Sequence, residues 1–347
     1  MNICFLVNQI STEYPTYASI LLAFAAHKRG HNVYLAEVGG LTYYPDGQMG
    51  TRARHVHSRK FKNTTTFLEA LKNKVNSTQV FTRELDVLWL RYNPAEEVDN
   101  RSWAQNAGIV FGQIAEKNDV LVLNHPGTLS FAINKMYFQH FPAIVRPRTI
   151  ITRNADEIMN FYEQMNKQIV LKPLLGSGGT DVFLLKDEAT NLNQIVQAIN
   201  RSGYVIAQEY LPEAVKGDTR ILMVNGKPLT VKNKYCAISR VNKTNDVRSN
   251  ISAGGVPKKA KITDKMLELA GIVGPKLRHD GLFYAGLDIA GDKLMEINVI
   301  SAGNLQSACT LEETDFTAPI IDAIERKVYY RKLYGNSLTN RELATMD

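Results

Sequence analysis

The chain has 347 residues, of which 44% are hydrophobic, so it is long enough for two or three domains and can bury a sizeable core. This composition excludes an intrinsically disordered chain, and no apolar run approaches the roughly 20 residues needed to cross a bilayer. The net charge is +7, and the three cysteines are few and widely spaced, which argues against a disulfide scaffold or a cysteine metal site. The N-terminus lacks the basic and apolar regions of a signal peptide, so we expect a soluble, cytoplasmic protein.

The first third of the chain shows strands that alternate with helices. We expect buried strands at residues 3–7, Asn32–Glu37, Asp86–Arg91 and Val120–Asn124, and helices near Tyr17–Arg29 and Trp103–Lys117. This alternation is typical of a parallel α/β layer. The pattern G-x-G-x-x-G is absent from it, which gives a dinucleotide-binding fold little support.

A run from Arg52 to Lys62 carries the densest positive charge. It lacks interleaved aromatic residues that could stack on bases, so we interpret it as a solvated loop and expect no nucleic-acid partner. His55 and His57 would share one face of a strand, as in some zinc sites, but no third ligand is evident, which favours the loop. A modest basic excess also suits an enzyme that handles nucleotides and carboxylates.

A lysine and a glycine-rich turn mark the middle of the chain. A helical stretch at Ser130–His140 carries Lys135, and two apolar runs then flank the turn Gly176–Gly179. Lys172 lies within the first run, where a charge is costly unless an anion meets it, and glycines let backbone N–H groups approach a phosphate closely. The pattern of a Walker loop is absent, since a strand and not a helix follows. The alternative is an ordinary glycine hairpin whose lysine extends to water.

The rest of the chain alternates between short strands and helices. We expect helices at Asn193–Ser202 and Lys265–Asp280, and strands at Val205–Tyr210, Thr219–Val224 and Lys227–Asn233. After about Glu325 the sequence is polar and rich in tyrosine. Tyr329, Tyr330 and Tyr334 either pack a terminal helix or belong to a loose tail.

Asp288, Glu296 and Asn298 lie in a stretch that predicts a β-hairpin. A two-residue turn at Gly291-Asp292 would place Asp288 and Glu296 on opposite faces. A three-residue turn, Gly291–Lys293, pairs them and brings Asn298 to the same face, because strand side chains repeat every two residues. We expect the three-residue turn, since the other face then carries only Leu287, Ile289, Met295, Ile297 and Val299. Three oxygen donors on one face suit Mg²⁺; the alternative is a solvated hairpin face.

In this order, these segments resemble the ATP-grasp ligases, and most closely the bacterial-type glutathione synthetases, up to about residue 327. The matching segments are 134–135, 170–179, 207–212, 217–220, 248–255, 286–288 and 296–298. The resemblance implies an α/β (α+β) protein in which an ATP-grasp fold follows an N-terminal parallel α/β domain. It divides the chain into an N-terminal domain at 1–125, a lid subdomain at 126–204, a catalytic subdomain at 205–330 and a tail at 331–347.

The resemblance also implies a site for ATP and a divalent metal. The residues expected to contact the nucleotide are Lys135, Lys172, Gly176, Ser177, Gly178, Gly179, Gln208, Glu209, Tyr210, Leu211 and Asp218. Asp288, Glu296 and Asn298 would hold Mg²⁺, or Mn²⁺, at the phosphates. In such ligases a carboxylate attacks the γ-phosphate, and cations must offset the repulsion between the two anions. An amine then attacks the acylphosphate, and the residues expected to stabilise these steps are Arg220, Arg248, Asn250, Gly254 and Gly255.

The segments that contact substrate in the family are altered in this chain. Arg91 keeps its place in a family segment Arg-Lys-Asp-Pro-Pro-Phe-Asp, but the Lys-Asp pair is lost. Arg240 precedes a loop that lacks the family's Pro and Gly-Gly, and Ser301 is the remaining match to Thr-Ser-Pro-Thr. We expect Arg91, Arg240 and Ser301 to contact the substrate.

Our interpretation is an ATP-dependent carboxylate–amine ligase that joins γ-glutamylcysteine to glycine. One alternative is an ATP-grasp ligase that makes a different small peptide or amide. Another is a non-catalytic protein that binds nucleotides or uses its basic surface for interaction. We expect small-molecule carboxylate and amine substrates, a homo-oligomer, and no membrane partner.

Overall fold

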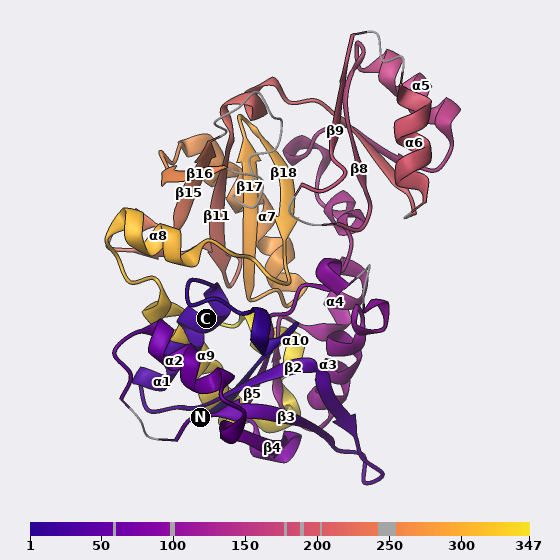
Figure 1. Ribbon diagram of the computed structural model, residues 1–347. Helices are drawn as coiled ribbons and strands as arrows, with labels where there is room; N and C mark the ends of the chain where they lie inside the picture. Colours follow the sequence, from indigo (N-terminus) through magenta and orange to yellow (C-terminus); the bar gives the residue numbers. More distant parts are fainter. Residues whose placement is uncertain (58–59, 98–100, 177–178, 188–190, 202, 242–254) are drawn as a thin grey trace.

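The computed structural model describes residues 1–57, 60–97, 101–176, 179–187, 191–201, 203–241 and 255–347. It contains three main sheets (Figure 1): a mixed sheet near the two chain ends, a central antiparallel sheet, and a small antiparallel sheet at the upper right. Helices cover these sheets, so the expected α/β class is confirmed. No helix in the described ranges is both long and apolar enough to span a bilayer.

The first sheet has the strand order β4-β3-β2-β1-β5-β6. Its parallel part consists of β1 (Asn2–Val7), β2 (Asn32–Tyr43), β5 (Val87–Leu90) and β6 (Leu121–Leu123). All four residues of β5 are buried, as is usual for a parallel strand covered on both faces. The helices α1 (Ala18–Lys28) and α3 (Ala107–Lys117) lie close to the expected positions.

Three elements of this first part were not expected: β3 (Met49–His55), α2 (Thr64–Lys72) and β4 (Ser77–Phe81). The solvated-loop interpretation of Arg52–Lys62 is therefore wrong at its start, where β3 pairs antiparallel with β2. His55 is buried, and its Nδ1 lies 2.8 Å from the carbonyl oxygen of Val33. In the described ranges no group of three His, Cys, Asp or Glu side chains could hold a metal, so His55 is a sheet residue there.

The small sheet has the order β7-β10-β8-β9, and all its pairings are antiparallel. It is built from β7 (Thr149–Thr152), β8 (Gln168–Pro173), β9 (Phe183–Lys186) and β10 (Val205–Glu209), with α5 (Ala155–Gln164) and α6 (Leu192–Asn200) on one side. Its buried side chains form a cluster of their own, which includes Ile158, Leu171, Val196 and Val205. We call this unit the lid; β10 belongs to its sheet, although the lid subdomain expected from the sequence ends at residue 204.

The central sheet has the order β16-β15-β11-β17-β18, with β12 paired to β11. Its strands are β11 (Asp218–Val224), β12 (Lys227–Pro228), β15 (Ala237–Val241), β16 (Val256–Lys259), β17 (Tyr284–Ala290) and β18 (Lys293–Asn298). The single strand expected at Lys227–Asn233 is wrong, because β12 ends at Pro228 and β13 (Thr230–Val231) pairs with β14 (Lys234–Tyr235) instead. Helix α7 (Asp264–His279) buries Leu269, Val273 and Leu277 in one cluster with side chains of this sheet and of the first sheet.

The helical stretch expected at Ser130–His140 is two separate elements. Helix α4 (Pro126–Ala132) ends before Asn134, and a 3₁₀ segment, Lys135–His140, begins after it. The Asn134 side chain accepts a hydrogen bond from the backbone N–H of Met136 at 2.9 Å, which explains the restart. Lys135 thus stands at the start of the second element, facing the central sheet.

The chain ends in α8 (Leu305–Glu312), α9 (Thr317–Tyr334) and α10 (Asn340–Thr345). The tyrosine-rich end forms a helix, as the first of the two interpretations has it, but only Tyr330 packs against a buried cluster shared with the first sheet, whereas Tyr329 and Tyr334 are exposed. Arg29 after α1 donates to Glu325 on α9 at 2.9 Å. The last helices therefore return to the first sheet (Figure 1).

Candidate active site

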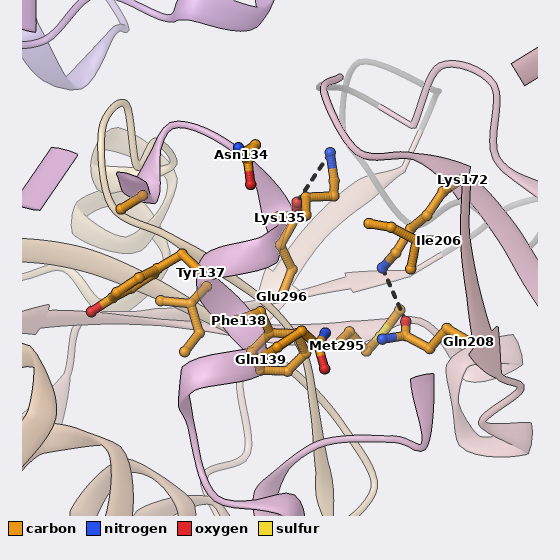
Figure 2. Close-up of a pocket in the computed structure, with 12 residues that line it drawn as sticks. Asn134, Lys135, Tyr137, Phe138, Gln139, Lys172, Ile206, Gln208, Met295 and Glu296 are labelled. Atoms are coloured by element: carbon orange, nitrogen blue, oxygen red, sulfur yellow. Dashed lines mark hydrogen bonds and ion pairs between the residues drawn. The ribbon is translucent and has the colours of Figure 1, made fainter. Parts of the chain in front are cut away.

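A cleft separates the lid from the central sheet, and it contains many of the predicted site residues. Its open space is about 980 Å³, near the upper end of the range for small-molecule sites. Its lining includes Lys135, Lys172, Gly176, Gly179, Gln208, Glu209, Tyr210, Leu211, Asp218, Arg240, Asp288 and Glu296. A smaller hollow of about 360 Å³, shown in Figure 2, shares Lys135, Lys172, Gln208 and Glu296 with the cleft.

The hairpin pairs Asp288 with Glu296, as expected, but not through a three-residue turn. The turn has two residues, Gly291-Asp292, because Ala290 pairs with Lys293. Gly291 has φ of +60°, which the first position of a two-residue type II′ turn requires. The register then shifts between Asp288 and Ile289, where a β-bulge sets two residues of β18 against one of β17.

The bulge changes which side chains enter the cleft. Leu294 is fully buried in the core, whereas Met295 is partly exposed and lines the cleft. The expectation that Met295 joins the apolar core face is therefore wrong. Leu287, Ile289 and Val299 do lie in the core.

Asp288 is buried and surrounded by cations. Nε and Nη2 of Arg220 each donate to its carboxylate at 2.6 Å, and Nη2 of Arg240 lies 2.8 Å away. Burial alone would raise the pKa of Asp288, but these two guanidinium groups outweigh burial and lower the pKa to about 2. Nδ2 of Asn298 donates to Asp288 at 3.2 Å, which leaves the amide oxygen of Asn298 for another partner.

Arg220 reaches Asp288 across a glycine. The two residues are direct partners in the pairing of β11 with β17, and Gly286 lies two residues before Asp288 on the same face. A Cβ at Gly286 would lie 3.3 Å from Cβ of Ala302 and 3.6 Å from Cδ of Arg220. Because Gly286 has no side chain, the side chain of Arg220 can extend along the sheet to Asp288.

Glu296 differs from Asp288 because its side chain is one-third exposed at the edge of the cleft. Its Oε1 lies 3.7 Å from Nζ of Lys135. Lys135 also donates to the carbonyl oxygen of Gly176, so the start of the glycine-rich turn is held beside the hairpin. Figure 2 shows Lys135 and Glu296 approaching one another from the 3₁₀ segment and β18.

Lys172 enters the cleft from β8. Along this strand Ile169 and Leu171 are buried, while Val170 and Lys172 alternate with them and line the cleft. Nζ of Lys172 donates to Oε1 of Gln208 on the neighbouring strand β10 at 2.9 Å (Figure 2). Burial lowers the pKa of Lys172 to about 8, although Glu296 and Asp288 act in the opposite direction.

The segment that joins the lid to the central sheet forms another wall. Glu209, Tyr210 and Leu211 follow Gln208 along the cleft, and Oε2 of Glu209 accepts from the backbone N–H of Arg148 at 2.9 Å. Asp218 is buried at the start of β11, and its Oδ1 accepts from Nε of Arg240 at 2.9 Å. Arg240 thus bridges two buried carboxylates.

Other predicted site residues lie elsewhere. Ser177, Gly178, Arg248, Asn250 and Gly254 lie outside the described residues. Gly255 is buried directly before β16. Arg91 is buried after β5, where it donates to the carbonyl oxygens of Ile300 at 3.3 Å and Ala302 at 2.9 Å, on either side of Ser301. Arg91 and Ser301 are therefore together, beyond the end of β18.

The order of these segments matches known family models over most of the chain. The prokaryotic glutathione synthetase N-terminal domain matches residues 1–129, and the ATP-grasp domain of the same synthetases matches residues 134–313. This chain belongs to the prokaryotic glutathione synthetase family. It is an ATP-grasp protein, and the family are carbon–nitrogen ligases.

Individual members of the glutathione synthetase family agree with this assignment. The glutathione synthetase of Shewanella oneidensis is 32% identical over 90% of this chain and 93% of its own length. The glutathione synthetase of Gloeobacter violaceus is 33% identical over 93% of this chain and 96% of its own length. Among solved structures, D-cycloserine synthetase DcsG has a TM-score of 0.62 at 13% identity, covering 94% of this chain and 99% of its own. The ATP-grasp ligase PsnB has a TM-score of 0.59 at 16% identity over 94% and 98%; both likenesses concern the fold.

The residues of this glutathione synthetase family site fit ATP and a divalent metal. Two carboxylates and an amide share the hairpin face, and hard oxygen donors of this kind are the ligands that Mg²⁺ takes in proteins. Lys135 and Lys172 line the same cleft, where their charge would meet phosphate oxygens.

The cleft lining also includes residues that were not predicted, among them Val170 and Met295. The signal for Val170 was available, because it alternates with Ile169 and Leu171 and shares a face with Lys172. The position of Met295 depends on the bulge, for which the sequence carries no comparable pattern.

Proposed function

We propose that this chain joins γ-glutamylcysteine to glycine at the expense of ATP, forming glutathione, ADP and phosphate. The observation that carries the proposal is the facing of Asp288 and Glu296 across the hairpin, in the cleft that Lys135 and Lys172 also line. Similarity to glutathione synthetases over nine-tenths of the chain supports the choice of substrates.

In the proposed reaction the cysteinyl carboxylate attacks the γ-phosphorus of ATP, and ADP leaves. The amine of glycine then attacks the acylphosphate carbon, loses a proton and expels phosphate. The first step brings two anions together, and the second develops negative charge on the carbonyl oxygen and the departing phosphate, so both rates depend on cations and hydrogen-bond donors that are already in place. A side-chain nucleophile is not required.

We assign the cations as follows. Lys135 and Lys172 would contact the phosphates, and Asp288, Glu296 and Asn298 would hold Mg²⁺ or Mn²⁺, which supplies charge neutralisation at the phosphate oxygens. Arg220 would face the transferring phosphoryl group from its place beside Asp288. Its short contacts with Asp288 support this assignment, because they fix the guanidinium at the metal face.

The proposal extends to the setting in which the enzyme works. Cys4, Cys236 and Cys309, all within the described residues, are free thiols, which suits a reducing compartment such as the cytoplasm. We propose small-molecule substrates and a homo-oligomeric state, which light scattering on the purified chain would measure.

The test is product formation from defined substrates. The purified chain, ATP and Mg²⁺ would be incubated with γ-glutamylcysteine and glycine, and the products identified by mass spectrometry. We expect glutathione in a 1:1 ratio with ADP, and ADP release that requires the acid. A product from another dipeptide or amine, with none from γ-glutamylcysteine, would identify a different ligase. Nucleotide binding without turnover on any acid would favour the non-catalytic alternative.

A further inference from the structure

The first sheet has a topological switch point at β1. Strand β1 pairs with β2 on one side and with β5 on the other, and all three are parallel. In open α/β sheets, ligands bind in the crevice outside the carboxyl ends of the strands at such a point. Glu13 lies in the segment after β1, and Arg91 directly follows β5.

Three buried polar side chains in this region have atoms without a hydrogen-bond partner among the described residues. They are Oε2 of Glu13, Nε of Arg91 and the hydroxyl of Tyr284. Glu13 is 7% exposed, Arg91 5% and Tyr284 0%. Roughly 90% of buried polar groups in proteins have a partner, so three neighbouring exceptions point to a missing one.

The three groups form one cluster. The guanidinium carbon of Arg91 lies 5.1 Å from the centre of the Tyr284 ring. Glu13 and Arg91 are close enough to act electrostatically on each other. Burial raises the pKa of Glu13 to about 7 and Glu96 adds to this effect, while Arg91 and Lys72 act in the opposite direction without outweighing burial.

The segment that carries Glu13 is fixed before any ligand arrives. Nζ of Lys72 donates to the carbonyl oxygens of Ser11 at 3.0 Å and Glu13 at 2.8 Å. The backbone N–H of Ile10 donates to Oε2 of Glu37 at 3.2 Å. A segment held in this way loses little backbone entropy when its carboxylate binds a cation.

The cluster is connected to the metal face of the cleft. Tyr284, Gly286 and Asp288 alternate along one face of β17, so Tyr284 and Asp288 are about 13 Å apart along the strand. Arg91 also holds the carbonyl oxygens of Ile300 and Ala302, just after Asn298. An extended substrate of about this length would therefore span the distance from Asp288 to the cluster.

The chemistry of the three free atoms defines what the far end of such a substrate carries. The carboxylate of Glu13 accepts from a cation, whereas Nε–H of Arg91 and the hydroxyl of Tyr284 donate to an anion. An α-ammonium and an α-carboxylate on one carbon satisfy both. A γ-glutamyl dipeptide has such a head, separated from its reacting carboxylate by roughly 10 Å of extended chain.

We propose that Glu13, Arg91 and Tyr284 form the subsite for the α-amino-acid head of the acid substrate, with Glu13 binding the ammonium group. This subsite selects γ-glutamyl acids over acids that lack the α-ammonium. The inference rests on the proposed function for the identity of the dipeptide, while the requirement for an ammonium group is a separate property.

The test compares two acids and two variants of the full chain. Glutaryl-cysteine is γ-glutamylcysteine without the α-ammonium. Glu13→Gln removes the charge with little change in volume, and Glu69→Gln is the matched control, since Glu69 is exposed on α2. Steady-state kinetics would be measured with each acid, and acid-induced thermal stabilisation with a non-hydrolysable ATP analogue present.

We expect Glu13→Gln to lower kcat/KM for γ-glutamylcysteine by roughly 10- to 100-fold, the range for a hydrogen bond to a charged group. The same change should leave kcat/KM for glutaryl-cysteine and the KM for ATP within about twofold, a non-additive pattern that a general structural defect does not produce. Glu69→Gln should match the parent with both acids.

The remaining outcomes separate this subsite from the proposed function. Equal losses for both acids, or no loss for either, would overturn the subsite; Glu13 would then support its loop or hold an ordered water. If the parent makes no product from γ-glutamylcysteine, the proposed function fails. Stabilisation by γ-glutamylcysteine that is lost in Glu13→Gln would still support the subsite, and stabilisation by neither acid would overturn it.

Discussion

Asp288 and Glu296 face each other across the hairpin, but their surroundings make them respond differently to mutation. Asp288 is buried and balances Arg220 and Arg240, whereas Glu296 is partly exposed beside Lys135. Removing one member of a buried ion pair leaves a charge without a partner, which costs about 3–5 kcal/mol. A partly exposed pair contributes less than about 1 kcal/mol.

We therefore predict that Asp288→Asn abolishes turnover and also lowers the free energy of unfolding by roughly 3 kcal/mol or more. Glu296→Gln should abolish turnover with a change in stability below about 1 kcal/mol. Coupled measurement of ADP release and urea unfolding checks both. Full activity in either variant would remove the metal assignment, and equal stability losses would contradict the difference in burial.

Lys172 provides a prediction about pH. In the free protein burial lowers its pKa to about 8, so between about pH 8 and 10 the side chain is largely neutral. Phosphate oxygens favour the charged form and raise the pKa, so ATP binding in this range should take up a proton. Calorimetry in two buffers of different ionisation enthalpy measures the uptake directly.

The control for this prediction is a cation that does not titrate. Lys172→Arg should keep nucleotide binding without proton uptake above pH 8, because arginine stays charged. Lys172→Met should lose both the uptake and roughly tenfold or more of ATP affinity. Unchanged affinity in Lys172→Met would show that Lys172 does not contact the nucleotide.

At the scale of single residues, the sequence identifies polar or charged side chains that lie within apolar segments. Lys172 in an apolar strand is one, and its place in the cleft could be predicted. Glu13 and Tyr284 carry no such signal, because the groups around them come from segments about 80 to 270 residues apart in the chain. Their unmet hydrogen bonds exist only after β1, β5 and β17 have come together.

The hairpin shows what pattern can and cannot predict for an element. The alternation of apolar and polar residues predicts that Asp288 and Glu296 share a face, and the structure agrees. Asp288 and Glu296 come to share a face through a β-bulge that follows a two-residue turn, because Gly291 favours the shorter turn. Shortening the turn by one residue and adding a bulge each shift the strand pairing by one residue, and the two shifts cancel. The same residues therefore share a face with a three-residue turn or with a two-residue turn followed by a bulge.

Leu294 and Met295 test this geometry as neighbours that face opposite ways. Leu294→Ala should lower the free energy of unfolding by about 2–5 kcal/mol, because Leu294 is fully buried, and leave the KM for ATP unchanged. Met295→Ala should raise the KM for ATP several-fold, with a smaller loss of stability, because Met295 lines the cleft. Chemical unfolding and initial-rate kinetics check the pair. The reverse pattern would place Met295 in the core and remove the bulge.

On the scale of the whole molecule, the last helices pack against the sheet that the first part of the chain forms. The lid has a separate apolar cluster, whereas the first and central sheets share theirs, and α9 and α10 pack against the first sheet. Strand positions in the first sheet could be predicted from their apolar runs. The packing of the last helices against the first sheet could not be predicted, because no pattern in the sequence of α9 indicates that it contacts α1 and β6.

Asn340 on α10 makes a specific contact between the last helices and the first sheet. Its side-chain oxygen accepts from the backbone N–H of Val122 at 2.7 Å, and its amide donates to the carbonyl oxygen of Val122 at 3.0 Å. It thereby acts as a further strand partner for β6, and it is itself buried. In Asn340→Ala two buried backbone groups lose their partner, which costs roughly 2–4 kcal/mol together.

We expect Asn340→Ala to lower the free energy of unfolding by that amount and to speed hydrogen exchange at the Val122 amide, while kcat/KM at low temperature stays unchanged. Asn336→Ala, on the exposed segment before α10, should change stability by less than about 0.5 kcal/mol. Urea unfolding and exchange mass spectrometry provide the measurements. If both variants lose the same stability, the side chain does not complete the edge of β6. If exchange at Val122 stays slow in Asn340→Ala, that edge has another source of protection, because only a paired or buried amide resists exchange in this way.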